Sequence, residues 1–347
     1  MTLLLERYAG LACGDIAIAD TTDALVAIAP EWEALWRMAE ASPFQSPAWL
    51  LPWWRAFGTS EPRVVTLRTD GVLKGILPLY LLDEGDQRKL LLIGVGITDY
   101  CDALIAPDLP TQEAAGILLH AALANAERNG TTSCALTDLP PRAALQIAAA
   151  PEGWREVALP QTPCPVLTLP AAQPDALKSA VPTRILRKIR QSRHRAERSG
   201  GWSTEVASEA DAPNAWRELA RLHRARWDAL GHPGGVLSDP DVQAFHDDAI
   251  PLLAAAGVLR MQILRLRDRI AAVYYTMTMP RRLLFYLSAF DGSDAFASPG
   301  TLLLADIVER SIAEGVRELH FLRGAEAYKY AWGAIDRLNT GRLLIPR

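Results

Sequence analysis

A run of three prolines in six residues, Pro160-Gln-Thr-Pro163-Cys-Pro165, divides the chain near its middle. Proline fixes φ and has no backbone N–H, so we expect this run to interrupt any helix or central strand. The chain has 347 residues, more than one hydrophobic core usually serves. We therefore predict two domains, residues 1–162 and 163–347, with the boundary near residue 162.

The two halves show the same order of predicted elements: helices, a hairpin, a crossing helix and a returning strand. In the first half these elements are helices within 24–57, a hairpin around Asp70-Gly71, a helix over 111–129 and a strand over 133–136. In the second half they are helices over 176–198, 215–230 and 239–256, a hairpin around 267–269, a strand over 283–290, a helix over 299–315 and a strand over 316–322. This order predicts an α/β fold class of the α+β type, with mixed, mostly antiparallel sheets flanked by helices.

Composition and charge narrow the classes of protein. Half of the residues are hydrophobic, which excludes wholesale disorder, and the net charge of −4 argues against a protein that coats nucleic acid. The four cysteines are widely spaced and form no CxxC, so we expect reduced thiols and no zinc site.

The N-terminal segment 1–10 lacks the apolar core of a signal peptide, because Glu6 and Arg7 follow its three leucines. No apolar run approaches the roughly 18 residues that a membrane span needs. We expect a cytoplasmic protein with no transmembrane segment. Peripheral membrane contact stays compatible with the sequence, and the oligomeric state cannot be predicted from it.

The segment Ser298-Pro299-Gly300-Thr301 follows a predicted strand and begins a predicted helix. Backbone N–H groups at a helix N-terminus bind phosphate, and Gly300 would let a ligand approach the backbone closely. We therefore predict that these four residues bind the phosphates of a cofactor. The alternative is an ordinary helix cap with proline in the first turn.

A basic segment, residues 184–198, carries seven Lys or Arg residues against one acid. Its apolar residues have helical spacing, so one stripe could dock while the charged faces stay in water. Arg187 and Arg190 are predicted to bind phosphate groups. The alternative is a solvated helix face without a ligand.

A loop after the last predicted strand of the second half contains a carboxylate, a phenol and an amine within four residues. We predict Glu326 as a general base, Tyr328 as a proton donor and Lys329 as a mostly exposed cation at a phosphate or carbonyl oxygen. Asp99 and Tyr286 are further catalytic candidates. A solvated glutamate and a core tyrosine are the alternatives. GxSxG and HExxH are absent from the sequence, so neither covalent catalysis nor a metal is expected.

These motifs carry a family resemblance. Residues 285–332 read as an aromatic strand, Phe-Asp, Ser-Pro-Gly, a leucine-rich helix and Phe-Leu-x-Gly-x-Glu-x-Tyr-Lys. This pattern resembles the GNAT acetyltransferase domain of CelD/BcsL-like proteins, which are associated with cellulose biosynthesis. Pro43-Phe44-Gln45-Ser46-Pro47-x-Trp49 and Thr98-Asp99-Tyr100 resemble the first domain of the same family. His320 departs from the pattern, because the family often has an acid there.

The resemblance implies two tandem GNAT-like domains, of which the first is degenerate and completes the cleft of the second. It implies transfer of an acyl group, most simply acetyl, from a CoA thioester to an amine or hydroxyl of a polar, saccharide-linked acceptor. Acyl-CoA would be the co-substrate and no metal would take part. Two alternatives stay open: a Fem-like transferase that uses aminoacyl-tRNA, and a non-catalytic accessory protein of cellulose or exopolysaccharide synthesis. Only the first of these implies a nucleic-acid partner.

Overall fold

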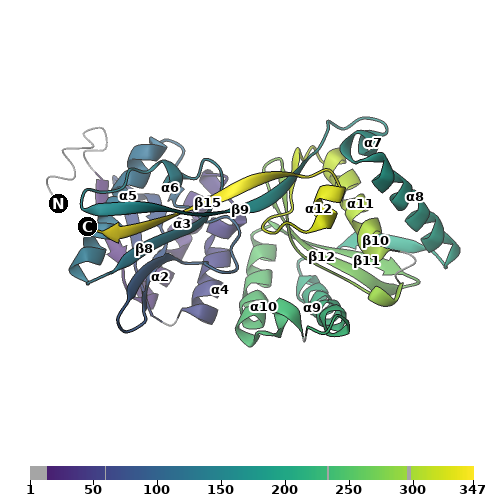
Figure 1. Cartoon of the computed structure of the whole chain (residues 1–347), viewed down its shortest axis with the longest axis horizontal. Coiled ribbons are helices and arrows are strands. Elements are labelled where there is room, and N and C mark those ends of the chain that lie inside the picture. The colour runs from purple at the N-terminus through teal and green to yellow at the C-terminus, as the bar shows by residue number, and fades with distance from the viewer. Residues whose placement is uncertain (1–13, 59, 233, 295–297) are drawn as a thin grey trace. The chain divides into compact units, whose positions relative to one another are not determined.

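The computed structural model describes residues 14–58, 60–232, 234–294 and 298–347 (Figure 1). The expectations for residues 1–10 and for Cys13 lie outside this part. The chain divides into two compact units. Unit 1 reaches Thr162 and also includes Leu338–Arg347, whereas unit 2 comprises Pro163–Arg337. No helix of the described residues is both long enough and apolar enough to cross a membrane.

The end of the chain corrects the predicted second domain. We expected residues 338–347 to belong to it, but they are part of unit 1. The last strand pairs there with the strand over Ser133–Leu139, with Thr340 opposite Leu139 and Leu343 opposite Ala135. Arg342 is buried and donates to both carboxylate oxygens of Glu156. Strand pairing at a distance of about 200 residues leaves no local signal in the sequence.

Unit 1 contains two sets of strands and the helices that cover them. Its strands are β1 (Gly14–Ala19), β2 (Glu61–Pro62), β3 (Val64–Thr69), β4 (Val72–Leu77), β5 (Leu79–Asp83), β6 (Arg88–Leu92), β7 (Leu104–Ile105), β8 (Ser133–Leu139), the first part of β9 (Trp154–Thr168) and most of β15 (Ile335–Pro346). Its helices are α2 (Thr22–Ala27), α3 (Ala29–Met38), α4 (Pro47–Phe57), α5 (Thr111–Arg128) and α6 (Ala144–Ile147), with a 3₁₀ turn over Pro43–Gln45.

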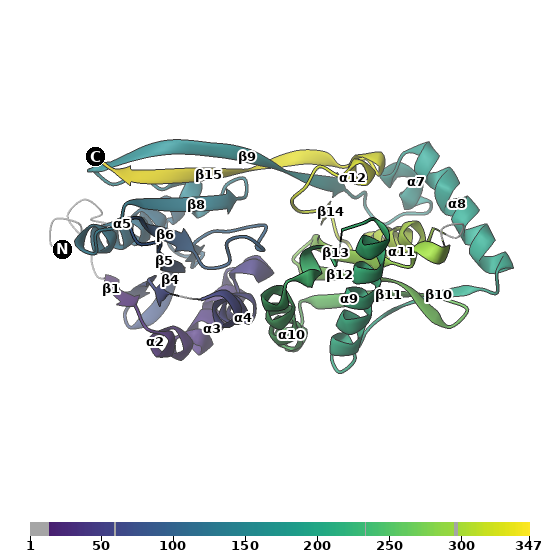
Figure 2. The same ribbon diagram turned by 60° about the horizontal axis from the view of Figure 1, so that its bottom comes forward.

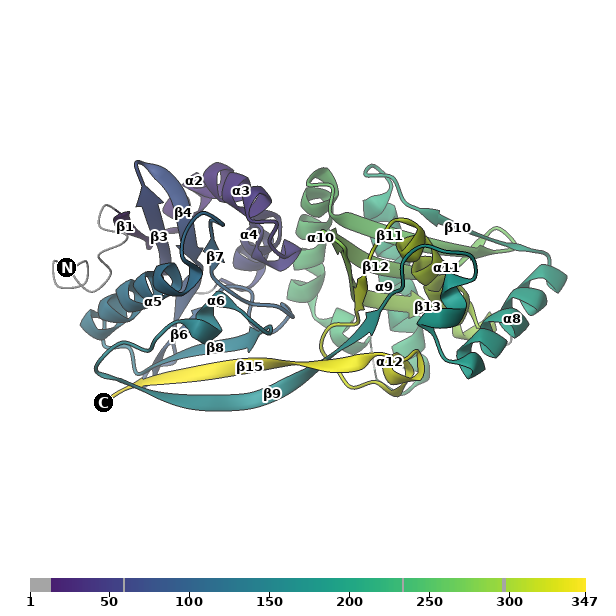
Figure 3. The ribbon, with the colours of Figure 1, turned by 90° about the horizontal axis from the view of Figure 1, so that it is seen from above.

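The four strands β1-β3-β4-β7 form one sheet. The other strands of unit 1 belong to a second sheet, in which they lie side by side in the order β9-β15-β8-β6-β5-β2 (Figure 2). Helix α5 lies between the two sets of strands (Figure 3) and connects β6 to the parallel strand β8. Six consecutive residues, 114–119, are buried, as expected of a helix that is covered on more than one side, and its buried side chains pack in one core with residues of β3, β6 and β8. The predicted crossing helix and returning strand are therefore present.

Strand β9 corrects the prediction for the proline run, because it continues straight through Pro160, Pro163 and Pro165. It lies between β14 (Glu318–His320) and β15 in the sheet order. Pro163 and Pro165 fit because their carbonyls are used as acceptors: Phe321 N–H donates to Pro165 O at 2.9 Å and Gly324 N–H donates to Pro163 O at 3.1 Å. A missing donor is harmless at a position where only the acceptor is needed.

Unit 2 has a mostly antiparallel sheet with helices on both faces. Its remaining elements are α7 (Ala176–Ala180), α8 (Thr183–Arg198), β10 (Trp202–Val206), α9 (Ala212–Ala229), α10 (Pro240–Ala255), β11 (Leu259–Leu266), β12 (Arg269–Met279), β13 (Arg282–Phe290), α11 (Pro299–Ala313) and α12 (Ala327–Ala331). The strand order is β10-β11-β12-β13-β14-β9. In Figure 1, α9 and α10 lie below these strands, and α8 and α11 lie above them. This architecture confirms the predicted fold class.

The predicted helix 176–198 is two helices in the structure. Helix α7 ends at Ala180, and Pro182 is the N-cap of α8. The residue before a proline avoids the helical region, and Val181 accordingly has the extended dihedral angles φ −131° and ψ 152°. The break gives α7 and α8 independent directions over α11.

Candidate active site

The sheet of unit 2 opens beside the second half of β13. The parallel register between β13 and β14 ends where Leu284 lies opposite His320, although β13 continues to Phe290. Residues 286–288 are only partly buried, even though they lie in the middle of the strand. A partly exposed stretch at this position marks the opening as a place where a ligand can reach the sheet.

A β-bulge lies at the start of this opening. Tyr275 of β12 is opposite Leu287 and Thr276 is opposite Phe285, so Tyr286 is an extra residue in β13. A bulged residue is left out of the regular ladder and bends its strand. The ring of Tyr286 packs against Tyr275 at 5.2 Å and His246 at 5.6 Å, which places it toward α10. Sequence reasoning selected Tyr286 for its hydroxyl, but its ring lies on the α10 side of the sheet, opposite α11, so the bulge brings only its backbone to the opening.

The N-terminus of α11 lies at the same opening, but its geometry differs from the expectation. Tyr274 Oη donates to Gly300 O at 2.8 Å. A Cβ on Gly300 would lie 3.0 Å from Tyr274 Oη and 3.1 Å from Phe290 Cδ1, so tight packing already requires this glycine. Pro299 has no N–H, and the N–H of Thr301 donates to Ser298 O. The helix start therefore offers a ligand fewer backbone donors than the sequence suggested.

The loop between β14 and α12 is organised around Lys329. Lys329 is 3% exposed, so the expectation of a mostly exposed cation is wrong. Its ammonium donates to Arg323 O at 2.7 Å and Gly324 O at 3.1 Å and lies 2.8 Å from Glu326 Oε2. The left-handed conformations of Leu322 and Gly324 turn the chain around it. Lys329 thus holds the loop in shape, and its donors are directed at protein acceptors.

Glu326 and Tyr328 lie on the exposed side of this loop. The side chain of Glu326 is 57% exposed and Tyr328 is 41% exposed. Partial burial raises the pKa of Tyr328, and the nearby charge of Glu326 raises it further. The Tyr328 hydroxyl is consequently protonated at neutral pH, as a proton donor must be.

Aromatic contacts connect the two predicted segments. Tyr328 packs edge-on against Phe321 at 5.9 Å, Phe321 against Phe285 at 5.6 Å, and Phe285 against Tyr274 at 4.7 Å. Tyr274 is the residue that binds the start of α11 through Gly300. The loop of Glu326 and Tyr328 and the Ser298–Thr301 segment therefore lie on the same face of the sheet.

Arg226, near the end of α9, is a candidate site residue that sequence reasoning missed. Its guanidinium carbon lies 4.3 Å from the centroid of the Phe290 ring. Its charge also lowers the pKa values of Tyr274 and Tyr328, against the dominant effect of burial. Arg226 thus places an exposed cation near both phenols. It is far in sequence from the other site residues, and only its basic position in the last turn of α9 could have drawn attention to it.

The other predicted phosphate ligands lie elsewhere. Arg187 and Arg190 are exposed on α8, whose Arg193 pairs with Glu309. Glu309 is nine residues along α11 from Gly300, or about 14 Å at the rise of an α-helix. Arg187 and Arg190 are therefore not brought to the Ser298–Thr301 segment. The basic helix faces a different part of the unit.

Asp99 belongs to unit 1, whereas the residues described above belong to unit 2. It is 8% exposed, and its backbone oxygen accepts from Asn339 Nδ2 at 2.6 Å. The neighbouring Asp102 accepts from the N–H groups of Ala103, Ala144 and Leu145, which fixes the start of α6. Both carboxylates lie in a tightly packed region.

His320 lies at the end of the pairing between β13 and β14. It is buried, and its Nε2 lies 2.9 Å from Glu318 Oε2. The hydrogen bonds from His320 and then Arg337 lower the pKa of Glu318 to about 2, against the effect of partial burial. His320 therefore pairs with an acid two residues away in β14. No cluster of His, Cys, Asp or Glu suited to a metal ion occurs among the residues that the structure describes.

Comparison with protein families identifies the type of domain in unit 2. Residues 183–330 match the family profile described as an acetyltransferase (GNAT) domain. The match includes Arg226, Gly300, Glu326 and Tyr328, and thus the whole opening beside β13. The domain is accordingly GNAT-like and of a transferase type. A comparison with curated proteins gives no match.

Several solved structures share the fold over nearly the whole chain. The crystal structure of FemX matches with a TM-score of 0.62 and 12% identity, over 90% of this chain and 95% of that chain. The C-terminal domain of a putative lysylphosphatidylglycerol synthetase from Agrobacterium fabrum matches with a TM-score of 0.58 and 14% identity, over 92% of both chains. The protein named L-PGS from Bacillus licheniformis matches with a TM-score of 0.55 and 12% identity, over 91% of both chains. At these identities the likeness concerns the fold alone.

Proposed function

We propose that unit 2 transfers an acyl group, most simply acetyl, from a CoA thioester to an amine or hydroxyl of a polar acceptor. The observation that carries this proposal is the opening beside β13, which begins at a bulge and has a protonated phenol and an exposed arginine near one another, all within the region that matches the acetyltransferase profile. A saccharide-linked acceptor, a cytoplasmic location and a place in the CelD/BcsL-like group follow from the sequence resemblance and are part of the same proposal.

The donor would lie along the exposed edge of β13. Arg226 supplies a guanidinium for a phosphate of CoA, a role that bidentate hydrogen bonds suit well. Ser298, Pro299, Gly300 and Thr301 would add the positive end of the α11 dipole. The bulge at Tyr286 would direct backbone groups at the thioester, because its N–H and C=O are outside the regular ladder.

The reaction needs a base and an acid. The lone pair of the acceptor amine or hydroxyl attacks the thioester carbon, and the C–S bond then breaks. Glu326 would take the proton that the acceptor loses, and Tyr328 would protonate the departing thiolate. Lys329 would act as a positioning residue, because its ammonium holds the backbone from which both side chains extend. These groups require no metal.

Unit 1 would serve binding and stability, with no chemistry of its own. In support, its region around Asp99 is packed with buried side chains, whereas Glu326 and Tyr328 are accessible. We therefore give Asp99 a structural role in this proposal, although the sequence suggested a catalytic one.

Ligand-dependent stability tests the donor. Acetyl-CoA at a hundredfold excess over its dissociation constant should stabilise the folded protein by about 2.7 kcal/mol. Arg226→Gln should weaken this binding, whereas the matched variant Arg217→Gln, near the other end of the same helix, should not. A radioactive acetyl-transfer assay with a panel of amino sugars and polyamines would then identify the acceptor.

The alternatives have distinct outcomes in the same experiment. The sequence resemblance leaves a Fem-like transferase open, and the likeness to FemX is a specific reason to test a charged tRNA as the donor. Binding of such a donor would depend strongly on salt concentration. Stabilisation by aminoacyl-tRNA but not by acetyl-CoA would replace the proposed donor. If neither ligand stabilises the protein, the accessory role in polysaccharide synthesis becomes the better account.

A further inference from the structure

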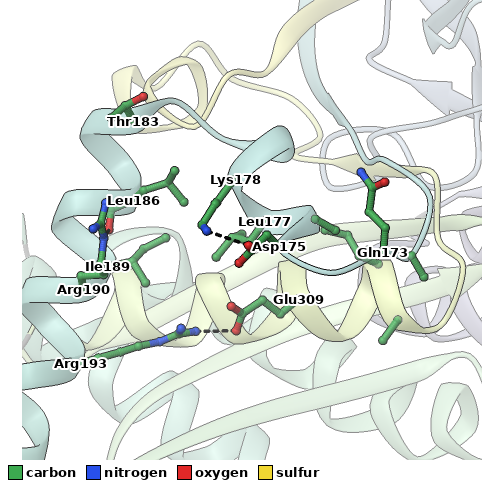
Figure 4. A pocket seen from close by; sticks show the side chains of 14 residues that line it. Gln173, Asp175, Leu177, Lys178, Thr183, Leu186, Ile189, Arg190, Arg193 and Glu309 are labelled. Atoms are coloured by element: carbon green, nitrogen blue, oxygen red, sulfur yellow. Dashed lines mark hydrogen bonds and ion pairs between the residues drawn. The ribbon is translucent and has the colours of Figure 1, made fainter.

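A groove of about 860 Å³ lies between α7, α8 and α11 (Figure 4). Leu177 comes from α7, Leu186 and Ile189 come from α8, and Ile312 comes from α11. Figure 4 shows the labelled apolar side chains between the helices, with charged groups around them. The α11 residues that line the groove, from Glu309 onward, belong to the C-terminal end of this helix, away from Gly300. The groove is therefore separate from the opening beside β13.

The charged side chains at the rim of the groove differ in whether they have an oppositely charged partner. Lys178 lies 2.8 Å from Asp175, and Arg193 lies 2.5 Å from Glu309. Arg190, in contrast, has its described hydrogen bond at 3.4 Å to Leu186 O, on its own helix. Arg190 also belongs to the strongly basic outer surface of α8. An anionic group at this rim would therefore meet a cation that no carboxylate in the described residues neutralises.

Size and polarity select the kind of ligand. A volume of about 860 Å³ falls within the range of about 300–1,000 Å³ that is usual for small-molecule sites. The apolar floor would gain by burying methylene groups, and the cationic rim would gain by binding an acid. A small polar metabolite would leave the floor in water, and a purely apolar ligand would leave Arg190 unused.

We propose that this groove is a binding site for a single-chain amphiphile with an anionic head group, whose acyl chain lies on Leu177, Leu186 and Ile189 and whose head group pairs with Arg190. The site goes beyond the proposed acyl transfer, because it shares no residue with the opening beside β13. A free fatty acid offers one acyl chain and an anionic head group, and so does one chain of an anionic membrane lipid together with its head group. The experiment separates these two sources.

Calorimetric titration with alkyl carboxylates below their critical micelle concentrations tests whether the acyl chain of the ligand contributes to binding. Dissociation constants should fall by about fourfold for each methylene from octanoate to dodecanoate, until the floor is filled. Dodecyltrimethylammonium, with the same chain and a cationic head, should bind much more weakly. Equal affinity along the series, or equal affinity for the cationic amphiphile, would overturn the proposal.

Variants test the two halves of the site. Arg190→Gln should weaken dodecanoate binding by about two- to fivefold, the usual range for an exposed ion pair. Arg187→Gln, an exposed arginine on the same helix outside the groove, is the matched control and should leave the affinity unchanged. Leu186→Gln should weaken binding by about tenfold, since its side chain forms part of the floor. Leu177→Gln serves the same purpose if Leu186→Gln does not fold.

Equal losses in Arg187→Gln and Arg190→Gln would show that the basic helix attracts anions without a groove, and the proposal would fail. Competition with vesicles identifies the source of the ligand. Phosphatidylglycerol vesicles that displace dodecanoate, where phosphatidylcholine vesicles do not, would support a membrane lipid. Failure of both to displace it would support a free fatty acid. Acetyl-CoA binding, measured separately, should be the same in all of these variants.

Discussion

Each unit contains two parallel strands joined by a helix. In unit 1 buried side chains surround the segment that follows the first of these strands, whereas in unit 2 the first strand continues as a partly exposed stretch. In unit 1 the motif is β6, α5 and β8, and in unit 2 it is β13, α11 and β14. After β6, the chain turns into a segment whose Thr98 accepts a hydrogen bond from the buried Trp49, and Tyr100 packs against Phe44. After the pairing of β13 with β14 ends, β13 instead continues with half-buried residues and a bulge.

The difference shows that topology alone does not make a site. Trp49, Phe44 and Tyr100 are large buried side chains that pack in and around the segment after β6. Glu326 and Tyr328, in contrast, are exposed in the loop after β14. Filled space stabilises a domain, and accessible polar groups on a rigid frame bind ligands. The same arrangement of strands and helix is therefore filled in one unit and accessible in the other, where we propose that the reaction takes place.

The largest expected effect is a loss of stability in unit 1, where buried side chains fill the region. Trp49→Ala removes a fully buried ring and its 2.8 Å hydrogen bond to Thr98, so it should lower the free energy of unfolding by about 3–5 kcal/mol. Tyr328→Ala, on the accessible side, should cost much less. Urea unfolding of both variants measures the difference. A loss below 1 kcal/mol in Trp49→Ala would show that this packing is not what fills unit 1.

The next effect concerns catalysis. Tyr328→Phe removes the proposed proton donor and should lower kcat by about a hundredfold, with a stability change within about 0.5 kcal/mol. Tyr100→Phe is the matched change in unit 1 and should leave kcat unchanged. Steady-state kinetics with the acceptor found in the transfer assay would decide. Similar kcat losses in both variants would mean that the two units share the chemistry.

Lys329→Met tests whether the accessible loop depends on a buried support. Removal of the Lys329 ammonium leaves the carbonyls of Arg323 and Gly324 without their donor, so the variant should lose about 2–3 kcal/mol of stability. Lys178→Met removes a lysine whose side chain is 65% exposed and should change stability by less than about 0.5 kcal/mol. Thermal unfolding measures both. A stable Lys329→Met protein that has lost activity would return Lys329 to a direct role in the reaction.

The smallest expected effect is a change in the pH dependence of stability, caused by Glu318 in β14. The folded-state pKa of Glu318 is about 2, below its ordinary value of 4.5, so its contribution to stability is present above pH 4.5 and is lost as the pH falls toward 2. Glu318→Gln should remove that part of the acid dependence, which we expect to be about 1 kcal/mol because the pair is partly exposed to solvent. Arg337→Gln should reduce it in the same direction. Unfolding curves between pH 7 and pH 2.5 test this, and parallel curves for Glu318→Gln and the natural protein would contradict the assignment.

Local patterns predicted the elements well. The hairpin around Asp70-Gly71, the helix that begins at Pro299 and the strand that ends at Phe290 are all present. Each depends on interactions within a few residues, such as turn chemistry and helical periodicity. The proline run misled the prediction because the penalty for a proline depends on whether its missing N–H is needed, and the pairing of Pro163 and Pro165 uses their carbonyls.

The sequence by itself determined the fold class, the hairpin and the crossing helix of each half, and the motif that contains Gly300, Glu326 and Tyr328, because these features depend on local spacing. It did not predict the strands β1, β9, β10 and β15. Only the tertiary structure decided that Arg226 lies beside Phe290, that Lys329 is buried, and that Arg187 and Arg190 lie away from the start of α11. It also decided that the end of the chain returns to unit 1. The physical reason is that burial and proximity across long separations are set by how whole elements pack, and a side chain's own neighbours in sequence carry no information about that packing.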